Sequence, residues 1–217
     1  MALITNLFAR RNRKLPPSRE ARAWTNGELR KFASLYRGDV INVSAWKDED
    51  KEGGHYCDYF VNASSYTTSN FDGWRGSDNA DRCLQIDLQK PLGPAYEGKF
   101  QVVFNHTTLE HVYQVFHAFS VLCRLSSDTV ILVVPFQQHL HGPEDGDFWR
   151  FTPYCVRRLF ADNELQVLYE SAHASVGGTY LFYVACLDPA RWEGQVPSSR
   201  IDETVLRKLH KRLRWKG

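Results

Sequence analysis

Side chains able to move protons or bind polar groups gather at two places in the sequence, each just after an apolar run. Asn105 and His106 form the first group, and His141, Asp147 and Arg150 form the second. An imidazole with an ordinary pKa of about 6.5 can take up a proton near neutral pH. We therefore predict His106 and His141 as candidate general bases, with Asp147 and Arg150 able to orient His141 or to hold a substrate.

Other polar residues follow other apolar runs in the same way. Asn70, Asp72 and Arg75 come after one run, and Asp87 comes after the next. In an open parallel sheet, ligands bind at the carboxyl ends of the strands. A rim of amides, carboxylates and histidines with aromatic neighbours suits a polar small molecule that has an aromatic part.

Each of these residues also has a simpler interpretation. His111, at the start of a predicted helix, is better explained as a structural histidine that holds a loop. Asp147 and Arg150 can pair with each other. His139 and His141 with the nearby carboxylates have the composition of a two-histidine, one-carboxylate metal site, but a solvated loop explains them more simply. We therefore expect no metal.

The elements that would position these residues can be read from the apolar pattern. Runs rich in β-branched and aromatic residues predict strands at 39–43, 65–71, 83–87, 100–105, 129–135, 165–171 and 180–187. Helical spacing predicts helices at 26–35 (with Thr25 or Asn26 as N-cap), 109–125 and 153–162.

Alternation of strands and helices predicts βαβ units and an α/β fold. The continuous apolar run 130–134 indicates a strand buried on both faces, as in a parallel sheet covered by helices. The connection 172–179 is too short for a crossover helix, so the last two strands should be antiparallel. We expect a doubly wound, seven-stranded, mostly parallel sheet with an antiparallel last strand.

Composition limits the class of protein. The chain has 217 residues, including 6 Trp, 10 Tyr and 13 Phe, which is more aromatic side chains than disordered chains carry. The length favours one domain with extensions. Its formal net charge is only +2, so no global field would draw it to nucleic acid, and we expect no nucleic-acid partner.

The cysteines and the two ends suggest where the protein works. The five cysteines are dispersed and form no Cys-x-x-Cys pair, which predicts reduced thiols and a cytoplasmic location. We see no signal peptide and no transmembrane segment. Both ends are basic, and Val205, Leu206, Leu209 and Leu213 predict an amphipathic helix. These basic tails could contact a membrane surface or a protein partner.

Three phrases of the sequence resemble motifs of one known family. FQVVFNHTTLEHV, at 100–112, resembles the central phrase, ending in Leu-Glu-His-Val, of class I S-adenosylmethionine-dependent methyltransferases of the type 11 group. HLHGPEDGDFWRFTP, at 139–153, is similar to a phrase of members associated with carbohydrate and cell-surface methylation. IDLQKPL, at 86–92, resembles the family's third-strand phrase. The resemblance covers about residues 39–187 and implies a Rossmann-like fold and an S-adenosylmethionine cofactor.

One family motif is degenerate in this sequence. Family members usually carry Gly-x-Gly-x-Gly after the first strand, where glycine lets the backbone approach the cofactor. Here residues 42–49 read NVSAWKDE, and the next glycines are Gly53 and Gly54.

The resemblance also implies a site and a domain division. It places the methionine part of the cofactor beside Asn42, Val43, Ser44, Ala45 and Trp46, the ribose beside Asn70 or Asp72, the adenine amino group beside Asp87, and the middle of the cofactor beside Asn105 and His106. The expected domains are a basic and helical extension at 1–37, a methyltransferase-like domain at 38–190 and a basic amphipathic tail at 191–217.

The function that the resemblance implies is methyl transfer from S-adenosylmethionine to an oxygen of a sugar or related small metabolite. His106 and His141 would then be the candidate bases, because a hydroxyl acceptor must lose its proton. The alternative is a catalytically inactive methyltransferase-like subunit that binds or scaffolds a partner. A metal-dependent enzyme using His139 and His141 is a weaker third hypothesis.

Overall fold

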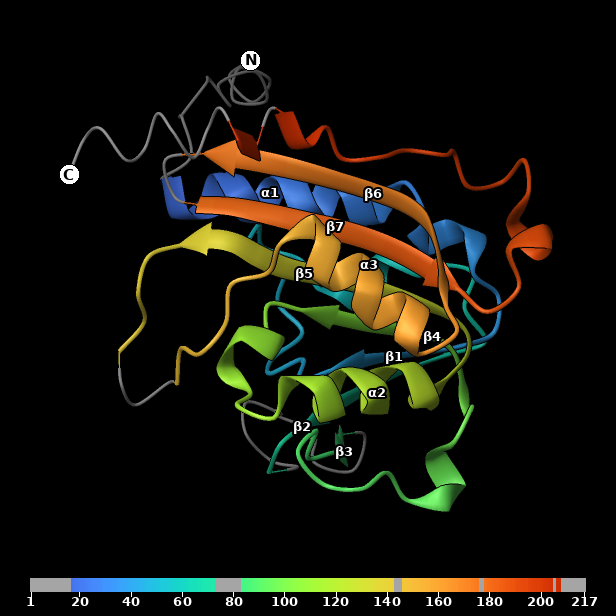
Figure 1. The fold of residues 1–217 in the computed structure, drawn as a ribbon. Coiled ribbons are helices and arrows are strands. Elements are labelled where there is room, and N and C mark those ends of the chain that lie inside the picture. The colour runs from blue at the N-terminus through green and yellow to red at the C-terminus, as the bar shows by residue number, and fades with distance from the viewer. Residues whose placement is uncertain (1–16, 73–82, 143–145, 176–177, 205, 208–217) are drawn as a thin grey trace, which may run out of the picture.

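A single seven-stranded sheet organises the described part of the chain (Figure 1). The computed structural model describes residues 17–72, 83–142, 146–175, 178–204 and 206–207. The strands are β1 (Asp39–Val43), β2 (Ser65–Asn70), β3 (Cys83–Gln85), β4 (Phe100–His106), β5 (Ser126–Gln138), β6 (Gln166–Ser175) and β7 (Gly178–Cys186), in the spatial order β3-β2-β1-β4-β5-β7-β6.

Strand direction confirms the predicted fold class. The pairs β1–β2, β1–β4, β2–β3 and β4–β5 are parallel, whereas β7 runs antiparallel to both β5 and β6. The sheet is therefore α/β, doubly wound and mostly parallel, with an antiparallel last strand. β5 is buried along residues 128–135, as its unbroken apolar sequence predicts.

Helices cover both faces of the sheet. The α-helices are α1 (Pro17–Arg30), α2 (Val115–Leu125) and α3 (Pro153–Asp162), and the short 3-10 helices are η1 (Ala33–Leu35), η2 (Tyr56–Tyr59), η4 (Pro94–Tyr96), η5 (Leu109–His111) and η6 (Pro189–Trp192). α2 and α3 pack on one face, and α1 packs on the other beside β6 and β7 (Figure 1).

Alternation along β4 divides its side chains between two cores. Val103 joins the core under α2 and α3, whereas Val102 and Phe104 join the core under α1. Successive side chains of a strand point to opposite faces. His106, two residues after Phe104, therefore points to the α1 face.

The first predicted helix is placed wrongly by the sequence pattern. α1 begins at Pro17 rather than near Asn26, and only the 3-10 helix η1 covers residues 33–35. Proline is favoured at the first helical position because its missing N–H is not needed there. Thr25 is not an N-cap: it lies inside α1, where its hydroxyl donates to the Arg22 carbonyl (2.8 Å).

The predicted helix at 109–125 is divided in two. η5 ends at His111, Val112 has extended backbone, and α2 begins at Val115. The neighbouring segment 148–149 explains the break: Phe148 N–H donates to the Glu110 carbonyl (2.8 Å), and the Trp149 indole donates to the Val112 carbonyl (3.0 Å). These carbonyls are thus satisfied outside a helix. The helix at 153–162 is confirmed as α3.

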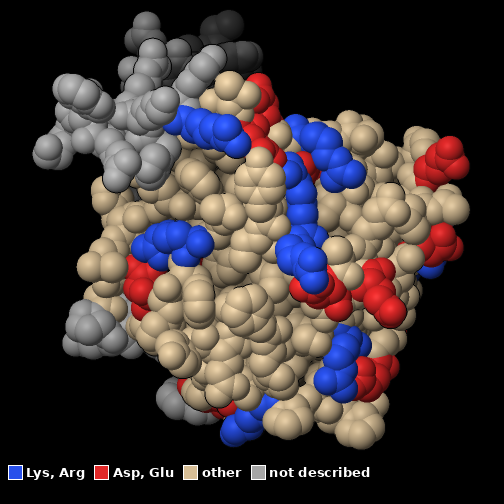
Figure 2. All heavy atoms as spheres, viewed as in Figure 1, with Lys and Arg blue, Asp and Glu red and all other residues tan. Residues whose placement is uncertain are grey.

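The predictions about the two ends concern residues that are largely outside the described ranges. This holds for the basic cluster near residues 10–14 and for most of the amphipathic helix expected around 205–213. Across the described ranges, none of the helices combines the length and apolar character needed to span a bilayer. On the face that carries α2 and α3, acidic and basic side chains are interspersed rather than gathered in one charged field (Figure 2).

Two phenylalanines of α2 provide a test of this packing. Phe119 is 1% exposed and its ring contacts that of Phe160 in α3 at 4.9 Å, whereas Phe116 is 66% exposed. We expect F119A to lower the free energy of unfolding by about 3–5 kcal/mol, because it leaves a cavity between helix and sheet. F116A should change it by less than about 1 kcal/mol. Urea unfolding of both variants checks this, and equal losses would contradict the described packing.

Candidate functional site

A cleft of about 640 Å³ opens at the carboxyl ends of the parallel strands. β1 pairs with β2 on one side and β4 on the other, so the chain leaves adjacent strands in different directions, and such a point is where α/β sheets bind ligands. The cleft is lined by Ser44, Trp46, Asn70, Phe71, Ile86, Asp87, Leu88, Gln89, Thr107, Thr108, His111, Val112 and His141.

Five of the residues predicted from sequence line this cleft: Ser44, Trp46, Asn70, Asp87 and His141. They come from the ends of β1, β2 and β3 and from the loop after β5. Residues far apart in sequence thus meet at one edge of the sheet. Asn42, Val43, Ala45, Asp72, Asn105, His106, Asp147 and Arg150 are not among the lining residues.

The loop after β1 has an unusual backbone. Ser44, Trp46 and Asp48 all have positive φ angles, of 58°, 51° and 58°. Such a conformation is strained for a residue with a Cβ and costs on the order of 1–3 kcal/mol each, so surrounding contacts must hold it. The loop therefore adopts, at residues other than glycine, the positive-φ conformation that glycine normally adopts.

Asn70 at the end of β2 is one of these contacts. Its side-chain oxygen accepts from the Trp46 N–H (2.7 Å), and its amide nitrogen donates to the Trp46 carbonyl (3.2 Å). The Ala45 N–H donates to the Ser69 carbonyl (2.9 Å). The amide of Asn70 thus holds the loop in place, although sequence alone suggested that it would bind a ligand.

Asp48 is the second anchor of the loop and is almost fully buried. Its carboxylate accepts hydrogen bonds from the Asn42 amide (2.7 Å), the Tyr66 hydroxyl (2.7 Å) and the Cys57 N–H (2.9 Å). Asn42 is therefore turned toward Asp48. The segment 44–64 between β1 and β2 contains only the 3-10 helix η2, so this network takes the place of a crossover α-helix.

Val43 and Asn105 are buried where β1 and β4 meet. The Asn105 amide donates to the Val43 carbonyl (2.9 Å), which ties the ends of the two strands together. Asp72 lies in the turn after β2, and Arg75 lies outside the described residues. Val43 and Asn105 thus shape the edge of the sheet rather than the surface of the cleft.

Asp87 supplies a carboxylate at the β3 end of the cleft. Its Oδ1 accepts from the Gln89 N–H (2.9 Å), and its Oδ2 lies 3.6 Å from Lys90 Nζ. Ile86 and Leu88 make the adjacent wall apolar, and the exposed ring of Phe71 also lines the cleft. An apolar slot ending in a carboxylate can hold a flat aromatic ring that has a hydrogen-bond donor on its edge.

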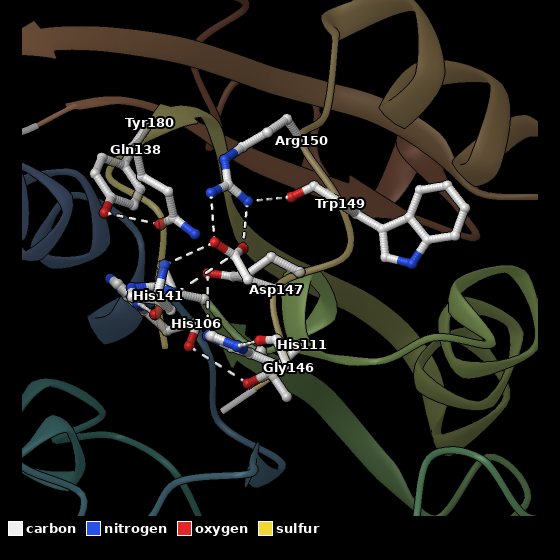
Figure 3. Close-up of polar contacts among 12 residues, drawn as sticks. His106, His111, Gln138, His141, Gly146, Asp147, Trp149, Arg150 and Tyr180 are labelled. Carbon is white, nitrogen blue, oxygen red and sulfur yellow. Dashed lines mark hydrogen bonds and ion pairs between the residues drawn. The ribbon is translucent and has the colours of Figure 1, made fainter. Parts of the chain in front are cut away.

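Asp147, Arg150 and His141 form a connected group beside the cleft (Figure 3). The Arg150 guanidinium donates to both oxygens of Asp147 (2.5 and 2.8 Å), and Asp147 Oδ2 accepts from the His141 N–H (2.8 Å). The hydrogen bonds from Arg150, and to a smaller extent the one from the His141 N–H, hold the pKa of Asp147 well below its ordinary value. The hydrogen bond to Asp147 in turn raises the pKa of Arg150. Asp147 therefore fixes the backbone of the loop that presents His141.

His106 lies on the other face of the sheet, under α1. The Arg22 guanidinium donates to His106 Nδ1 (2.7 Å), so Nε2 carries the ring proton and donates to the Thr25 hydroxyl (2.9 Å). Burial and the Arg22 charge hold the pKa of His106 well below its ordinary value. A role as general base, which the sequence predicts, would require α1 to move away from this ring.

Sequence reasoning missed several residues of the site. Thr107, Thr108 and His111 line the cleft, and Glu110 is fully buried behind His111. Burial raises the pKa of Glu110 to about 7. The Leu-Glu-His phrase pointed to this part of the site. A continuous helix starting at residue 109, however, would have oriented the Glu110 and His111 side chains differently.

The loop that carries His139 and His141 has the composition of a metal site. Within the described ranges, no group of three or more His, Cys, Asp or Glu side chains is arranged to hold a metal ion. Glu144 and Asp145 lie outside these ranges.

Comparison with known proteins gives a consistent picture of the fold. No protein-family model matches the sequence, and neither does any curated protein. Solved structures do match. Magnesium protoporphyrin IX methyltransferase from Synechocystis PCC 6803, with bound S-adenosylmethionine, is 13% identical, with 79% of this chain and 80% of that chain covered and a TM-score of 0.56.

Two further structures are similar. The 1,6-didemethyltoxoflavin-N1-methyltransferase of Burkholderia thailandensis, with bound S-adenosylhomocysteine, is 13% identical over 76% of this chain and 80% of that one, with a TM-score of 0.52. The YcgJ protein of Bacillus subtilis is 11% identical, with 76% of this chain and 98% of that chain covered and a TM-score of 0.57. The chain therefore has the Rossmann-like fold seen in methyltransferases. At these identities the likeness concerns the fold alone.

The Asp147–Arg150 pair predicts how stability depends on pH. Because the pKa of Asp147 is lowered in the folded state, its contribution is present above the ordinary carboxyl value of about 4 and is lost as the pH falls toward the folded-state value. We expect D147N to be less stable than the wild type by about 2 kcal/mol at pH 7 and the gap to narrow in acid.

Urea unfolding at neutral and acid pH measures this difference. D162N is the matched control, since Asp162 forms an exposed pair with Arg158 (2.8 Å), and exposed pairs contribute less than about 1 kcal/mol. A D147N variant as stable as the wild type at neutral pH would show that the pair does not hold the loop.

Proposed function

We propose that the chain is an S-adenosylmethionine-dependent methyltransferase whose cofactor binds in the cleft. The observation that carries the proposal is the position of Asp87: its carboxylate stands at the end of β3, beside an apolar wall, in a cleft at the switch point of a methyltransferase-type sheet. The similar structures from Synechocystis and Burkholderia hold S-adenosylmethionine and S-adenosylhomocysteine.

The residues at the β3 end of the cleft fit an adenosine group. The carboxylate of Asp87 can accept a hydrogen bond from an exocyclic amine, and Ile86 and Leu88 can cover the ring. The volume of about 640 Å³ lies within the range of about 300–1,000 Å³ that is usual for small-molecule sites.

The loop after β1 would meet the amino-acid part of the cofactor. Its Ala45 and Trp46 N–H groups are already hydrogen-bonded, so it offers fewer backbone donors than a glycine loop. Lys47 and Lys51 lie over the Trp46 ring, at 5.6 and 4.5 Å from its centroid. Their ammonium groups can supply positive charge for a carboxylate that the backbone does not reach.

Methyl transfer is an in-line displacement, so the protein mainly supplies proximity and a proton acceptor. When bound, the cofactor would supply an electrophilic methyl group. His141, one of the two bases that the sequence predicts, lines the cleft on a loop fixed by Asp147. Transfer to an oxygen of a sugar is a finer proposal, which is supported by the phrase at 139–153 and by the polar side chains of this loop.

The alternative is a catalytically inactive subunit that uses the same cleft for another ligand or partner. Two features favour it. Trp46, a bulky side chain that is 50% exposed, lines the cleft, and Asn70 is hydrogen-bonded to the loop at the position expected to meet the ribose. In this case the cleft would not accept S-adenosylhomocysteine.

Calorimetric titration with S-adenosylhomocysteine separates the two proposals. We expect the wild type to bind it and D87N to bind it at least about 10-fold more weakly, because a carboxylate that accepts from the adenine amino group is lost. D39N is the matched control, since Asp39 lies at the opposite end of the sheet, where it accepts from Ser65.

W46G tests whether the tryptophan obstructs the cleft. Glycine tolerates the positive φ of this position, so the loop should keep its shape. Absence of wild-type binding at millimolar ligand, with binding restored in W46G, would support the inactive subunit. Absence of binding in both proteins would contradict a cofactor site in this cleft.

A further inference from the structure

Glu110 is a buried carboxyl group that forms no hydrogen bond with any other described side chain. It lies in η5 with 0% exposure, and neither side-chain oxygen has a hydrogen-bond partner among the described residues. Its backbone carbonyl, by contrast, accepts from Phe148. Burying a polar group without a partner is costly, and groups of this kind are found where they serve a chemical role.

The neighbouring His111 has a tautomer that the structure determines. Its Nδ1 lies 2.5 Å from the Gly146 carbonyl oxygen, which can only accept, so Nδ1 must carry the hydrogen (Figure 3). In the neutral ring the lone pair is then on Nε2, which lies 4.0 Å from Glu110 Oε1. His111 lines the cleft, and its ring packs against that of His141 at 4.8 Å.

The charged groups around Glu110 come from four elements. Burial raises its pKa to about 7, while the N–H of its own backbone, His111 beside it, Arg150 before α3 and Arg22 in α1 act in the opposite direction. Tyr180 in β7 is also close enough to interact with it, since burial and then the Glu110 charge raise the pKa of that hydroxyl. The pKa of Glu110 thus lies near neutral pH, and its Oε1 lies 4.0 Å from Nε2 of His111.

We propose that His111 Nε2 is the proton acceptor of the cleft and that Glu110 is the positioning residue that stabilises the imidazolium. This inference rests on the proposed methyltransferase function and replaces His141 as the base. The carbonyl of Gly146 holds the ring in the required tautomer, and the Glu110 carboxylate offsets the positive charge that forms on it.

The step balances with an acceptor that carries a hydroxyl group. His111 Nε2 takes the hydroxyl proton while the acceptor oxygen forms its bond to the methyl carbon. The electron pair of the carbon–sulfur bond leaves with the sulfur, which changes from a sulfonium to a neutral thioether. The proton remains on His111, beside Glu110, until it passes to water.

The other two histidines near the site are less suited to this step. His106 Nδ1 already accepts from Arg22 under α1. Nδ1 of His141 lies 4.0 Å from Asp147 Oδ1, but both oxygens of Asp147 already accept hydrogen bonds from Arg150. Among these histidines only His111 faces a carboxyl group with no other hydrogen-bond partner in the described residues.

Nitrogen-15 NMR of the histidine rings tests the tautomer in the protein without any ligand. We expect neutral His111 to carry its hydrogen on Nδ1. His117 is the internal control: its Nε2 lies 3.0 Å from the Lys90 carbonyl, so it should carry its hydrogen on Nε2. An Nε2–H tautomer at His111 would overturn the inference whatever the protein catalyses.

Carbon-13 NMR of the glutamate carboxyl groups tests the coupling. Because His111 lowers the pKa of Glu110, H111Q should raise that pKa above about 7, whereas H117Q should leave it unchanged. A Glu110 titration that is the same in H111Q and the wild type would show that the two groups do not interact electrostatically, and would also overturn the inference.

Transfer of a tritiated methyl group from S-adenosylmethionine to a panel of monosaccharides and phenols tests the role itself. We expect H111Q to lower kcat by about 100-fold or more and to leave S-adenosylhomocysteine affinity within about 3-fold. E110Q should shift the pH profile of kcat.

If the wild type transfers methyl groups and H111Q does so equally well, the inference fails alone. If the wild type binds no S-adenosylhomocysteine, the proposed function fails and this role fails with it.

Discussion

The site depends on one constraint, the parallel pairing of β1 with β2 on one side and β4 on the other. Parallel strands end at the same edge of the sheet, and the chain must leave neighbouring strands toward opposite faces at this point. The loop after β1, the end of β2, the turn after β3 and η5 therefore face one another across the cleft. Ser44, Trp46, Asn70 and His111 meet at the cleft because of this arrangement and not because of local sequence.

The loop after β1 shows how a strained backbone can be kept without glycine. The positive φ angle at Trp46 is held by hydrogen bonds to Asn70, and the one at Asp48 is held by the three hydrogen bonds to its carboxylate. The side chains that hold this loop are consequently less free to bind a ligand. A ligand in this cleft would meet a rigid surface with a tryptophan and two lysines, where a glycine loop would offer bare backbone.

Much of the fold could be predicted from sequence because its signals are local. The unbroken apolar run of β5 and the Thr152-Pro153 start of α3 were sufficient, since the Thr152 hydroxyl accepts from the Cys155 N–H as an N-cap. The start of α1 and the break after η5 were not predictable in this way. The break after η5 depends on hydrogen bonds that residues 148–149 donate to the carbonyls of Glu110 and Val112, nearly 40 positions earlier in the chain.

The candidate site was predictable only in part, for the same reason. Asp87 and His141 follow strands, so their place at the cleft edge could be inferred from the topology. The contact of His106 with Arg22 could not be inferred from the topology, because the sequence pattern predicted a helix that begins after Arg22. Asn70 was correctly placed at the end of β2, but its hydrogen bonds to Trp46 depend on a loop conformation that no sequence pattern in this chain indicates.

The central claim is that this cleft is a cofactor site, and a crystal structure of the protein grown with S-adenosylhomocysteine tests it most directly. The account predicts adenine density beside the Asp87 carboxylate and amino-acid density beside the Ser44–Trp46 loop. A cleft free of ligand density in crystals soaked at millimolar concentration, or S-adenosylhomocysteine bound elsewhere, would contradict it.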